Sequence, residues 1–366
     1  MITLENNLIG LLSGTLPANP NWAQIFKDAR KQTLLGVTYD IVEGLPVEQQ
    51  PPREVLMPWV AVQSRIIANN KLTDQRAAEA TAILSSMGFR SCVLKGQGVA
   101  RLYPKPELRQ SGDVDIWVEG DRWQVLAALK ARFEVGDTVY HHTDVKFFPD
   151  VEVEVHYHPS WLCNPFLNRK LQRFFDGKMD EQMSHRCPYK YRSDGDSGSS
   201  AGAGAVDMGF NCPTVEFDAV YSLVHIYRHL FDEGVGLRQV MDYFYIIKAL
   251  LAEERSGVMD VLRSLRMRRF AAGMMYVLQQ VFGLSESEFL CPSDKKTGEF
   301  ILNEMLLSGN FGHYDVRNKH AADEGLVKRA FRKTGRQLKF VRYFPQEVLW
   351  APLWRVWHYF WRKRHN

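Results

Sequence analysis

Apolar residues recur with helical spacing over a long stretch in the first quarter of the chain. Between residues 53 and 87 they fall every three or four positions, which predicts a long amphipathic helix that Gly88 closes. Shorter patterns of the same kind predict helical segments at residues 5–12 and 21–35. Together they indicate an N-terminal helical region over residues 1–87.

The spacing of apolar positions then shortens to two, as it does in β-strands. Strands are predicted at residues 91–94, 113–118, 144–148 and 151–157, with helices at residues 96–103 and 121–133. Few strands flanked by helices are typical of an α+β (α/β) fold. We therefore expect a small mixed β-sheet core flanked by helices, within a domain over residues 88–192.

The second half of the chain begins with a change in composition. Residues 193–209 are rich in Gly, Ser and Ala and are predicted to form a flexible loop, because such a segment cannot bury a core. Helical patterns return at residues 214–282 and 295–307. These patterns predict an all-helical C-terminal domain over residues 210–366.

Composition adds limits to this outline. The chain has 366 residues, of which 45% are hydrophobic and 24% charged, as in an ordinary globular protein. It contains no run of eighteen uncharged apolar residues, and its first residues lack the pattern of a signal peptide. Its five cysteines are scattered without a Cys-x-x-Cys pair, which indicates reduced thiols. We expect a cytoplasmic protein without a transmembrane segment.

Two carboxylates stand out within the strand at residues 113–118. Side chains alternate along a strand, so Asp113 and Asp115 share one face while Val114 and Ile116 face the core. Adjacent carboxylates repel each other, and their burial is costly unless a cation lies between them. Mg²⁺ is such a cation, since it binds one or two carboxylates together with substrate phosphates. A solvated strand face is the alternative interpretation of this pair.

Small and basic residues around the pair favour phosphate binding. Lys95, Gly96 and Gly98 lie between a predicted strand and a short helix, where backbone N–H groups are free for a phosphate. Ser111 and Gly112 precede Asp113 and permit close approach of a ligand.

A third carboxylate is available on the strand at residues 151–157. Glu152 and Glu154 share one face of it, and pairing of this strand with the Asp113 strand would bring three carboxylates together. Two metal ions can then hold the attacking and leaving oxygens of a phosphoryl transfer. His156 and His158 lie on the same face, where they suit hydrogen bonding or substrate contact better than a zinc site.

The order Leu94-Lys95-Gly96, then Leu-Arg109-x-x-x-Asp113-x-Asp115, then Glu154-x-His156-Tyr resembles the uncharacterised nucleotidyltransferase family of the polymerase-β-like superfamily. The resemblance covers roughly residues 60 to 250. It implies that Asp113, Asp115 and Glu154 bind Mg²⁺ (or Mn²⁺), and that Lys95, Gly96 and Arg109 lie at the triphosphate. The usual Gly-Ser of the superfamily is replaced here by Gly96-Gln97, and the spacing to Asp113 is longer.

The helical half contains further polar candidates. His225 and His229 are one helical turn apart, but the third ligand of a zincin-type metal site is missing. Arg238 and Asp242 have the spacing of an intrahelical ion pair. The family pattern also has a His, an Arg and an Asp in this region, which implies that His229, Arg238 and Asp242 border the substrate cleft.

The C-terminal segment is basic and aromatic. Residues 326–366 contain eleven Lys or Arg and one acidic residue, so about +10 of charge lies there although the whole chain carries +4. Trp350, Trp354, Trp357 and Trp361 fall on one helical stripe. Packing against the protein itself is the simpler interpretation. Contact with an anionic membrane or a nucleic acid is the alternative, and it requires an exposed stripe.

The sequence therefore predicts a metal-dependent nucleotidyltransferase. It would transfer a nucleoside monophosphate from a nucleoside triphosphate to an unknown acceptor hydroxyl or phosphate and release pyrophosphate. The alternatives are a catalytically inactive nucleotide-binding or regulatory module on the same fold, and an adaptor that binds nucleic acid or membrane through the tail.

Overall fold

The computed structural model describes residues 7–189, 206–312, 335 and 337–365. Its strands are β1 (Ser91–Leu94), β2 (Val114–Val118), β3 (Val135–Thr138), β4 (His142–Val145), β5 (Val153–His156), β6 (Arg186–Tyr189) and β7 (Val206–Asn211). Its helices are α1 (Asn7–Ser13), α2 (Trp22–Lys31), α3 (Leu35–Glu43), α4 (Arg53–Ser86), α5 (Gly96–Ala100), α6 (Arg122–Lys130), α7 (Pro165–Ser184), α8 (Val215–Asp232), α9 (Leu237–Ala249), α10 (Arg255–Ser264), α11 (Arg268–Phe282), α12 (Lys295–Ser308), α14 (Pro345–Val348) and α15 (Ala351–His365). The predicted α+β fold class is confirmed.

The central sheet has five strands in the order β1-β2-β5-β4-β3. Strands β2 and β5 run parallel, whereas the other neighbours are antiparallel, so the sheet is mixed. The pairing of β2 with β5 sets Asp115 beside Glu154 in register. Strands β6 and β7 form a separate antiparallel pair.

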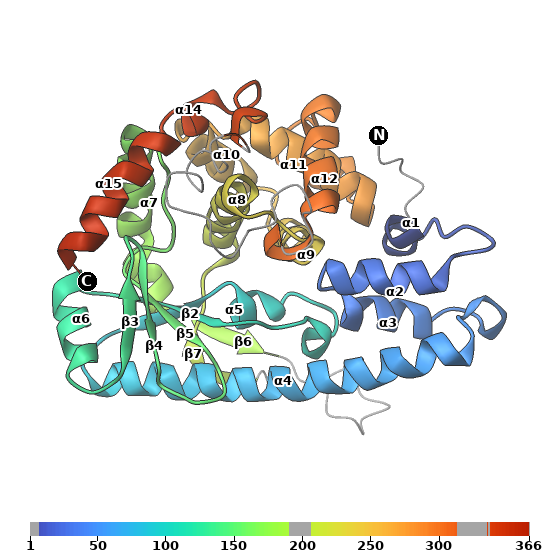
Figure 1. Ribbon diagram of the computed structural model, residues 1–366, viewed down its shortest axis with the longest axis horizontal. Helices are drawn as coiled ribbons and strands as arrows, with labels where there is room; N and C mark the ends of the chain where they lie inside the picture. Colours follow the sequence, from blue (N-terminus) through green and yellow to red (C-terminus); the bar gives the residue numbers. More distant parts are fainter. Residues whose placement is uncertain (1–6, 190–205, 313–334, 336, 366) are drawn as a thin grey trace.

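Helices cover both faces of the sheet (Figure 1). On one face, Val114, Ile116 and Val118 of β2 pack in a hydrophobic cluster with residues of α4 and α6. On the other face, Trp117 stacks on Phe217 of α8, with ring centroids 5.6 Å apart. The alternation predicted for β2 is thus present, and it turns Asp115 toward the helical C-terminal region.

Helix α4 runs along the whole length of the sheet (Figure 1). It extends from Arg53 to Ser86, close to the predicted 53–87, and Gly88 follows with a φ of +87°. Ala77, Ala80 and Leu84 pack against the sheet, which accounts for the helical spacing of the apolar residues.

Several predicted boundaries were wrong in detail. The strand predicted at 144–148 begins earlier and ends at Val145, because its position is set by pairing with β5. Strand β3 was missed, and the helix predicted at 96–103 ends at Ala100. The loop predicted at 193–209 lies outside the described residues up to residue 205, and Val206 begins β7.

The C-terminal helices lie above the sheet, and α15 lies along one side of the molecule (Figure 1). The tryptophan stripe of α15 packs on the protein in part: Trp354 packs on Tyr140 and Trp161, and Trp361 stacks on Trp123, while Trp357 is 44% exposed. This agrees with the packed interpretation of the stripe. Within the described part of the chain, no helix has both the length and the hydropathy that crossing a bilayer requires.

Candidate active site

Asp113 and Asp115 lie where β2 begins. Asp113 immediately precedes the strand, and Asp115 is buried within it, with 1% of the residue exposed. Glu154 is the register partner of Asp115 on the neighbouring parallel strand, and a quarter of its side chain is exposed. The pairing on which the sequence argument depended is therefore present.

His156 connects the two carboxylates. Its Nε2 lies 2.9 Å from Oδ1 of Asp115 and 3.1 Å from Oε2 of Glu154. Burial lowers the pKa of His156, but its hydrogen bonds to Asp115 and Glu154 outweigh burial and raise the pKa to about 9. Burial raises the pKa of Glu154, yet the hydrogen bond with His156 and the charge of Lys95 bring it down to about 2.

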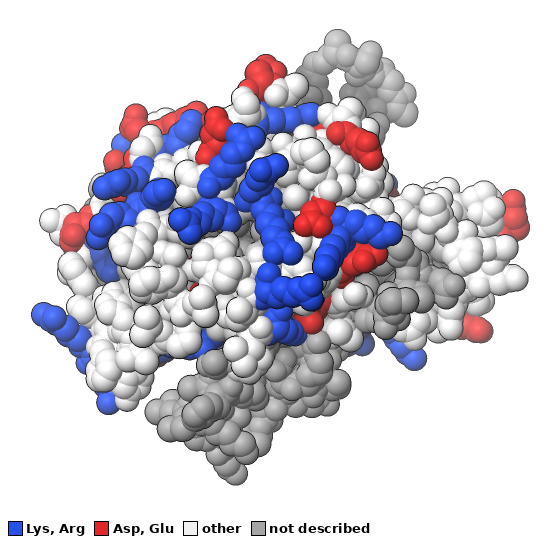
Figure 2. All heavy atoms as spheres, turned by 90° about the horizontal axis from the view of Figure 1, so that it is seen from above, with Lys and Arg blue, Asp and Glu red and all other residues white. Residues whose placement is uncertain are grey.

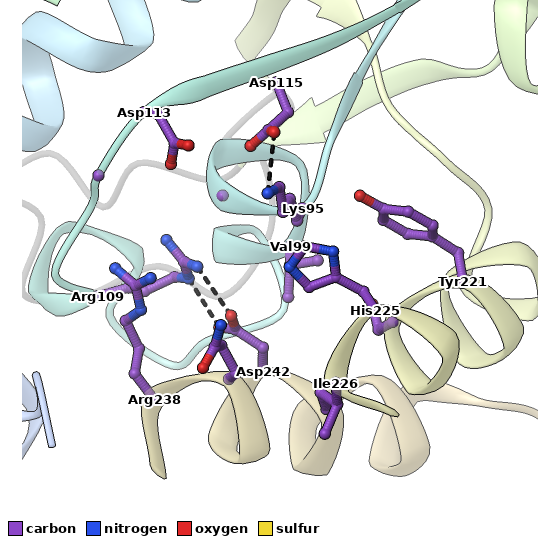
Figure 3. A pocket seen from close by; sticks show the side chains of 14 residues that line it. Lys95, Val99, Arg109, Asp113, Asp115, Tyr221, His225, Ile226, Arg238 and Asp242 are labelled. Atoms are coloured by element: carbon purple, nitrogen blue, oxygen red, sulfur yellow. Dashed lines mark hydrogen bonds and ion pairs between the residues drawn. The ribbon is translucent and has the colours of Figure 1, made fainter. Parts of the chain in front are cut away.

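Lys95 supplies a second positive charge. Its Nζ lies 2.9 Å from Oδ1 of Asp115 (Figure 3). Burial alone would lower the pKa of Lys95, but the charges of Asp115 and Asp113 raise it above its usual range. The residue adopts a φ of 33°, which side-chain-bearing residues rarely do, and such backbone conformations cluster at functional sites.

The donor set fits a divalent cation. Ligand atoms of Asp115, Glu154 and His156 lie within 4.8 Å of one another. Carboxylate oxygens suit Mg²⁺, and an added imidazole nitrogen also suits Mn²⁺ or a softer ion. Asp113 is not in a group of this kind among the described residues, but it lines the same cavities as Asp115 and Glu154.

The two predicted phosphate-binding glycines after β1 differ in their positions relative to the cavity. Gly96 lines the cavity with Lys95 and has a φ of +42°. Gly98 lies on the protein side of α5, where an added Cβ would come within 2.6 Å of the Val93 carbonyl oxygen. Gly98 therefore allows α5 to pack on β1, and in this structure it does not line the cavity.

The two predicted phosphate-binding residues just before β2 also differ in their positions relative to the cavity. Gly112 lines the cavity, and its absent Cβ leaves space next to Nη1 of Arg238. The hydroxyl of Ser111 instead lies 3.4 Å from that of Thr73 on α4. Of this predicted pair, the structure places Gly112 at the cavity.

Two arginines line the same cavity, and one of them is fixed by Asp242. Nε and Nη2 of Arg109 donate to the two carboxylate oxygens of Asp242 at 2.7 and 2.8 Å, and Tyr103 adds a third bond at 2.6 Å. Arg238 donates instead to the Gln110 carbonyl at 2.8 Å, so the predicted Arg238–Asp242 ion pair was wrong. The packing of α9 beside the segment that precedes β2 brings Arg109 to Asp242, and the sequence does not show this packing.

The guanidinium groups of Arg109 and Arg238 lie side by side near Asp113 (Figure 3). Burial, followed by the charge of Arg109, lowers the pKa of Arg238. Nη1 of Arg109 is buried and has no hydrogen-bond partner among the described residues. Two buried guanidinium groups with a free donor are a site for an anion such as phosphate.

Three hollows meet at Asp113. One contains Lys95, Arg109 and Arg238. A second, of about 280 Å³, lies between Glu154 on the sheet and His229 on α8. A third, of about 640 Å³, is lined by residues of β4, β5 and the turn between them, including Glu152. Asp113 and Glu154 thus border the two larger hollows, whereas the hollow between the arginines has a volume of only about 30 Å³.

The structure distinguishes the candidate glutamates and locates the candidate histidine. Glu154 is aligned with Asp115, whereas Glu152 comes before β5 and uses its carbonyl to accept the N–H of Val114 at 3.0 Å. His229 lines the second hollow, where its Nδ1 lies 3.3 Å from Oε2 of Glu233.

Sequence reasoning missed other residues around the site. The hydroxyl of Tyr221 on α8 points toward Lys95 (Figure 3), is buried, and has no hydrogen-bond partner in the part of the chain described. The helical spacing of Tyr221 and His225 was the available signal for it. His142 is the cross-strand partner of His156, and no local pattern could show this.

Comparisons with known proteins identify the family. Residues 18–283 match the model of a protein family described as uncharacterised nucleotidyltransferase. Among solved structures, the chain is similar to an antigenic nucleotidyltransferase-like protein from Paracoccidioides brasiliensis, with 15% identity and a TM-score of 0.30 over 56% of this chain and 92% of that chain. The search of curated proteins gave no significant match.

Proposed function

The chain belongs to the uncharacterised nucleotidyltransferase family, and we propose that it transfers a nucleoside monophosphate from a nucleoside triphosphate to an acceptor hydroxyl or phosphate. Membership of the family supports nucleotidyl transfer as the general reaction. The finer proposal, a divalent-metal-dependent reaction that releases pyrophosphate, depends on the arrangement of charges around Asp115.

The observation that carries the proposal is the convergence of opposite charges at one buried point. Asp115 and Glu154 are adjacent in register, and Lys95 lies 2.9 Å from Asp115. Arg109 and Arg238 line the cavity that contains Asp113. Oxygen ligands beside three cationic side chains are what a metal–triphosphate complex requires, because phosphoryl transfer depends mainly on positioning and charge stabilisation.

Each residue then has a distinct role in the proposed reaction. Asp113, Asp115 and Glu154 would hold Mg²⁺ or Mn²⁺, which would supply positive charge to neutralise the phosphates. Lys95 and the free Nη1 of Arg109 would donate to phosphate oxygens. Glu154 is also placed to accept a proton from the acceptor hydroxyl, since it lines both hollows that open on the outer side of Asp113.

A labelled-nucleotide assay tests the proposal. The protein is incubated with each α-labelled nucleoside triphosphate and Mg²⁺ or Mn²⁺, and triphosphate binding, pyrophosphate release and label transfer are measured. Asp113→Asn and Asp115→Asn should each abolish turnover. Glu119→Gln is the matched control, because this carboxylate follows the far end of β2 and pairs with Arg90 on the surface.

The outcomes separate the possible functions. Absence of triphosphate binding by the wild type, or unchanged turnover in the aspartate variants, would overturn the proposal. Metal-dependent binding of a triphosphate without turnover against any acceptor tested would favour the non-catalytic nucleotide-binding module.

A further inference from the structure

Three histidines lie beside the carboxylates, and two of them, His141 and His142, have no part in the proposed reaction. We propose that His141, His142 and His156, together with Glu154, form a second metal site that binds Zn²⁺. The site shares Glu154 with the proposed Mg²⁺ site. A catalytic role for this second site would rest on the proposed function, but Zn²⁺ binding itself does not, since it can be measured without nucleotide.

Strand pairing builds this cluster. His142 on β4 is the register partner of His156 on β5, and both side chains point to the face that carries Glu154. The carbonyl of His141 accepts the N–H of Tyr157 at 2.8 Å, which fixes its backbone beside the end of β5. Two of the histidines therefore come from adjacent strands, and His141 directly precedes one of them.

Ligand atoms of the three histidines lie within 4.8 Å of one another, and two of the histidines also lie close to Glu154. Nδ1 of His142 lies 2.9 Å from Nε2 of His141 and 3.3 Å from Oε2 of Glu154. Nε2 of His156 lies 3.1 Å from the same Oε2. Ligands at about 2.0–2.1 Å from Zn²⁺ are separated from one another by about 2.8–3.4 Å, so the side chains would move toward a common point on binding it.

The surroundings indicate an open site rather than a closed structural one. The ring of Trp161 packs on His141, with centroids 4.0 Å apart, and Arg228 lies over Trp161 at 4.3 Å. The histidines line the hollow that also contains Lys95 and Asp113. Three imidazoles and one carboxylate favour Zn²⁺ over Mg²⁺, and a site that opens on a substrate hollow can accept a substrate oxygen.

Metal titration tests the site. Protein treated with a chelator and dialysed is titrated with Zn²⁺ by calorimetry, and with Co²⁺ while visible absorption reports nitrogen ligation. One equivalent should bind, and the double variant His141→Gln/His142→Gln should bind roughly a hundredfold more weakly or worse. His158→Gln is the matched control, because His158 stacks on Tyr140 instead of joining the cluster.

Several results would overturn the proposal: no Zn²⁺ binding by the wild type, unchanged binding in the double variant, or an equal loss in His158→Gln. Circular dichroism checks that each variant is folded. Triphosphate binding with Mg²⁺ is measured on the same samples, so failure of the Zn²⁺ site is distinguishable from failure of the proposed function.

A second feature, a stripe of α15 that lies about 100° around the helix from its tryptophans, is independent of the active site. We infer that this outer face docks on an anionic lipid surface. Leu353, Val356 and Phe360 lie on it at helical spacing and are 61%, 58% and 63% exposed, and Leu349 before the helix is 64% exposed. Phe166 on α7 extends the apolar surface through its ring contact with Trp350.

The charges around this face are positive. Lys363 and Arg364 are exposed in the last turn of α15, and the helix contains no acidic residue. Arg169, Lys170 and Arg173 are exposed on α7 nearby, where Arg169 lines an apolar hollow together with Leu353. Seen from above, Lys and Arg side chains also gather over the C-terminal helices (Figure 2).

This combination favours lipid over other partners. Exposed Leu, Val and Phe gain little from a nucleic acid, whereas they can enter the boundary between headgroups and acyl chains. A second copy of the chain would place two positive faces against each other. Anionic headgroups complement the basic residues, while the apolar side chains supply the remaining binding energy.

Vesicle flotation tests this inference with the full chain. The wild type should float with vesicles of phosphatidylcholine and phosphatidylglycerol, release at high salt, and not float with phosphatidylcholine alone. Leu353→Ser/Phe360→Ser should weaken binding by about tenfold or more. Lys363→Gln/Arg364→Gln should weaken it by roughly fivefold per charge.

Val47→Ser/Leu251→Ser is the control, because these apolar side chains are 83% and 56% exposed elsewhere on the molecule. Equal flotation with both vesicle types, none with either, or normal flotation of Leu353→Ser/Phe360→Ser would overturn the inference. The inference would also be overturned if the wild type formed a dimer, or bound a transfer RNA probe, and Leu353→Ser/Phe360→Ser abolished that association.

Discussion

The guanidinium of Arg109 and the carboxylate of Asp242, 133 positions apart, form a two-point ion pair with both side chains buried. The pair joins the segment before β2 to helix α9. Because Arg109 also lines the cavity that contains Asp113, the position of the proposed phosphate-binding arginine is set by a helix of the C-terminal half. The sheet and the helical region therefore contribute to one site.

Removal of one partner of this pair should be strongly destabilising. Asp242→Asn leaves the Arg109 charge buried without compensation, and we expect a loss of roughly 3–5 kcal/mol in the free energy of unfolding. Denaturation by urea, followed by circular dichroism, measures it. The double variant Arg109→Met/Asp242→Leu should be less destabilised than Asp242→Asn, because neither charge remains. A double variant that is at least as unstable as the single one would contradict this account.

The buried hydroxyl of Tyr221 predicts opposite effects on stability and binding. Tyr221→Phe removes a hydroxyl without a hydrogen-bond partner among the described residues, so the free energy of unfolding should rise by about 1 kcal/mol. If that hydroxyl donates to the nucleotide, triphosphate affinity should fall at the same time by about tenfold. Calorimetry with a nucleoside triphosphate and thermal denaturation measure the two effects. Tyr243→Phe is the control, because its hydroxyl is equally buried and does not line the cavity.

Lys95 should matter more for turnover than for substrate affinity. Its Nζ lies beside Asp115, where charge develops on the phosphates in the proposed reaction. Lys95→Gln should lower kcat by about 10²–10³-fold, as loss of one preorganised donor does in other enzymes. Pyrophosphate release measures kcat and KM separately. Lys105→Gln removes an exposed lysine paired with Asp40 and should leave both constants unchanged. A change confined to KM would assign Lys95 to ground-state binding instead.

The sequence was informative wherever a local pattern determines structure. The apolar spacing of α4 and the alternation of β2 depend on neighbouring residues. Both elements, and the face of β2 on which Asp115 lies, could therefore be predicted. The pairing of β2 with β5 was a conditional prediction, and its register now explains why Glu154 rather than Glu152 lies beside Asp115.

Long-range relationships were the ones that the sequence concealed. The partner of Asp242 is Arg109 rather than the residue one turn away, because tertiary packing overrides the weak helical ion pair. His142 meets His156 only through the register of β4 and β5, and the strand was expected two residues too late. The outer apolar face of α15 was hidden for another reason: the tryptophans dominate the pattern, and each exposed apolar residue directly precedes one of them.

The stability of the fold should depend on pH through Asp218 of α8. Burial raises the pKa of this carboxyl from 3.8 to about 7, although Arg101, 3.7 Å away, opposes the shift. Asp242 on α9 adds a second negative charge nearby. Between pH 4 and pH 7 the folded protein keeps the proton that the unfolded chain has released. Stability from this group is therefore complete below pH 4 and is lost as the pH rises to 7, by up to about 1.4 kcal/mol per pH unit.

Asp218→Asn removes this titration while it keeps the shape of the side chain. The free energy of unfolding of the variant relative to the wild type should thus increase from pH 4 to pH 7 and level off above it. Urea denaturation at several pH values measures the difference, in which contributions of other groups cancel. Asp260→Asn, an exposed carboxylate paired with Arg263, should give a difference that is nearly independent of pH. A flat difference for Asp218→Asn as well would mean that Arg101 holds Asp218 ionised throughout, and that the pair is a buried salt bridge supporting the end of α5.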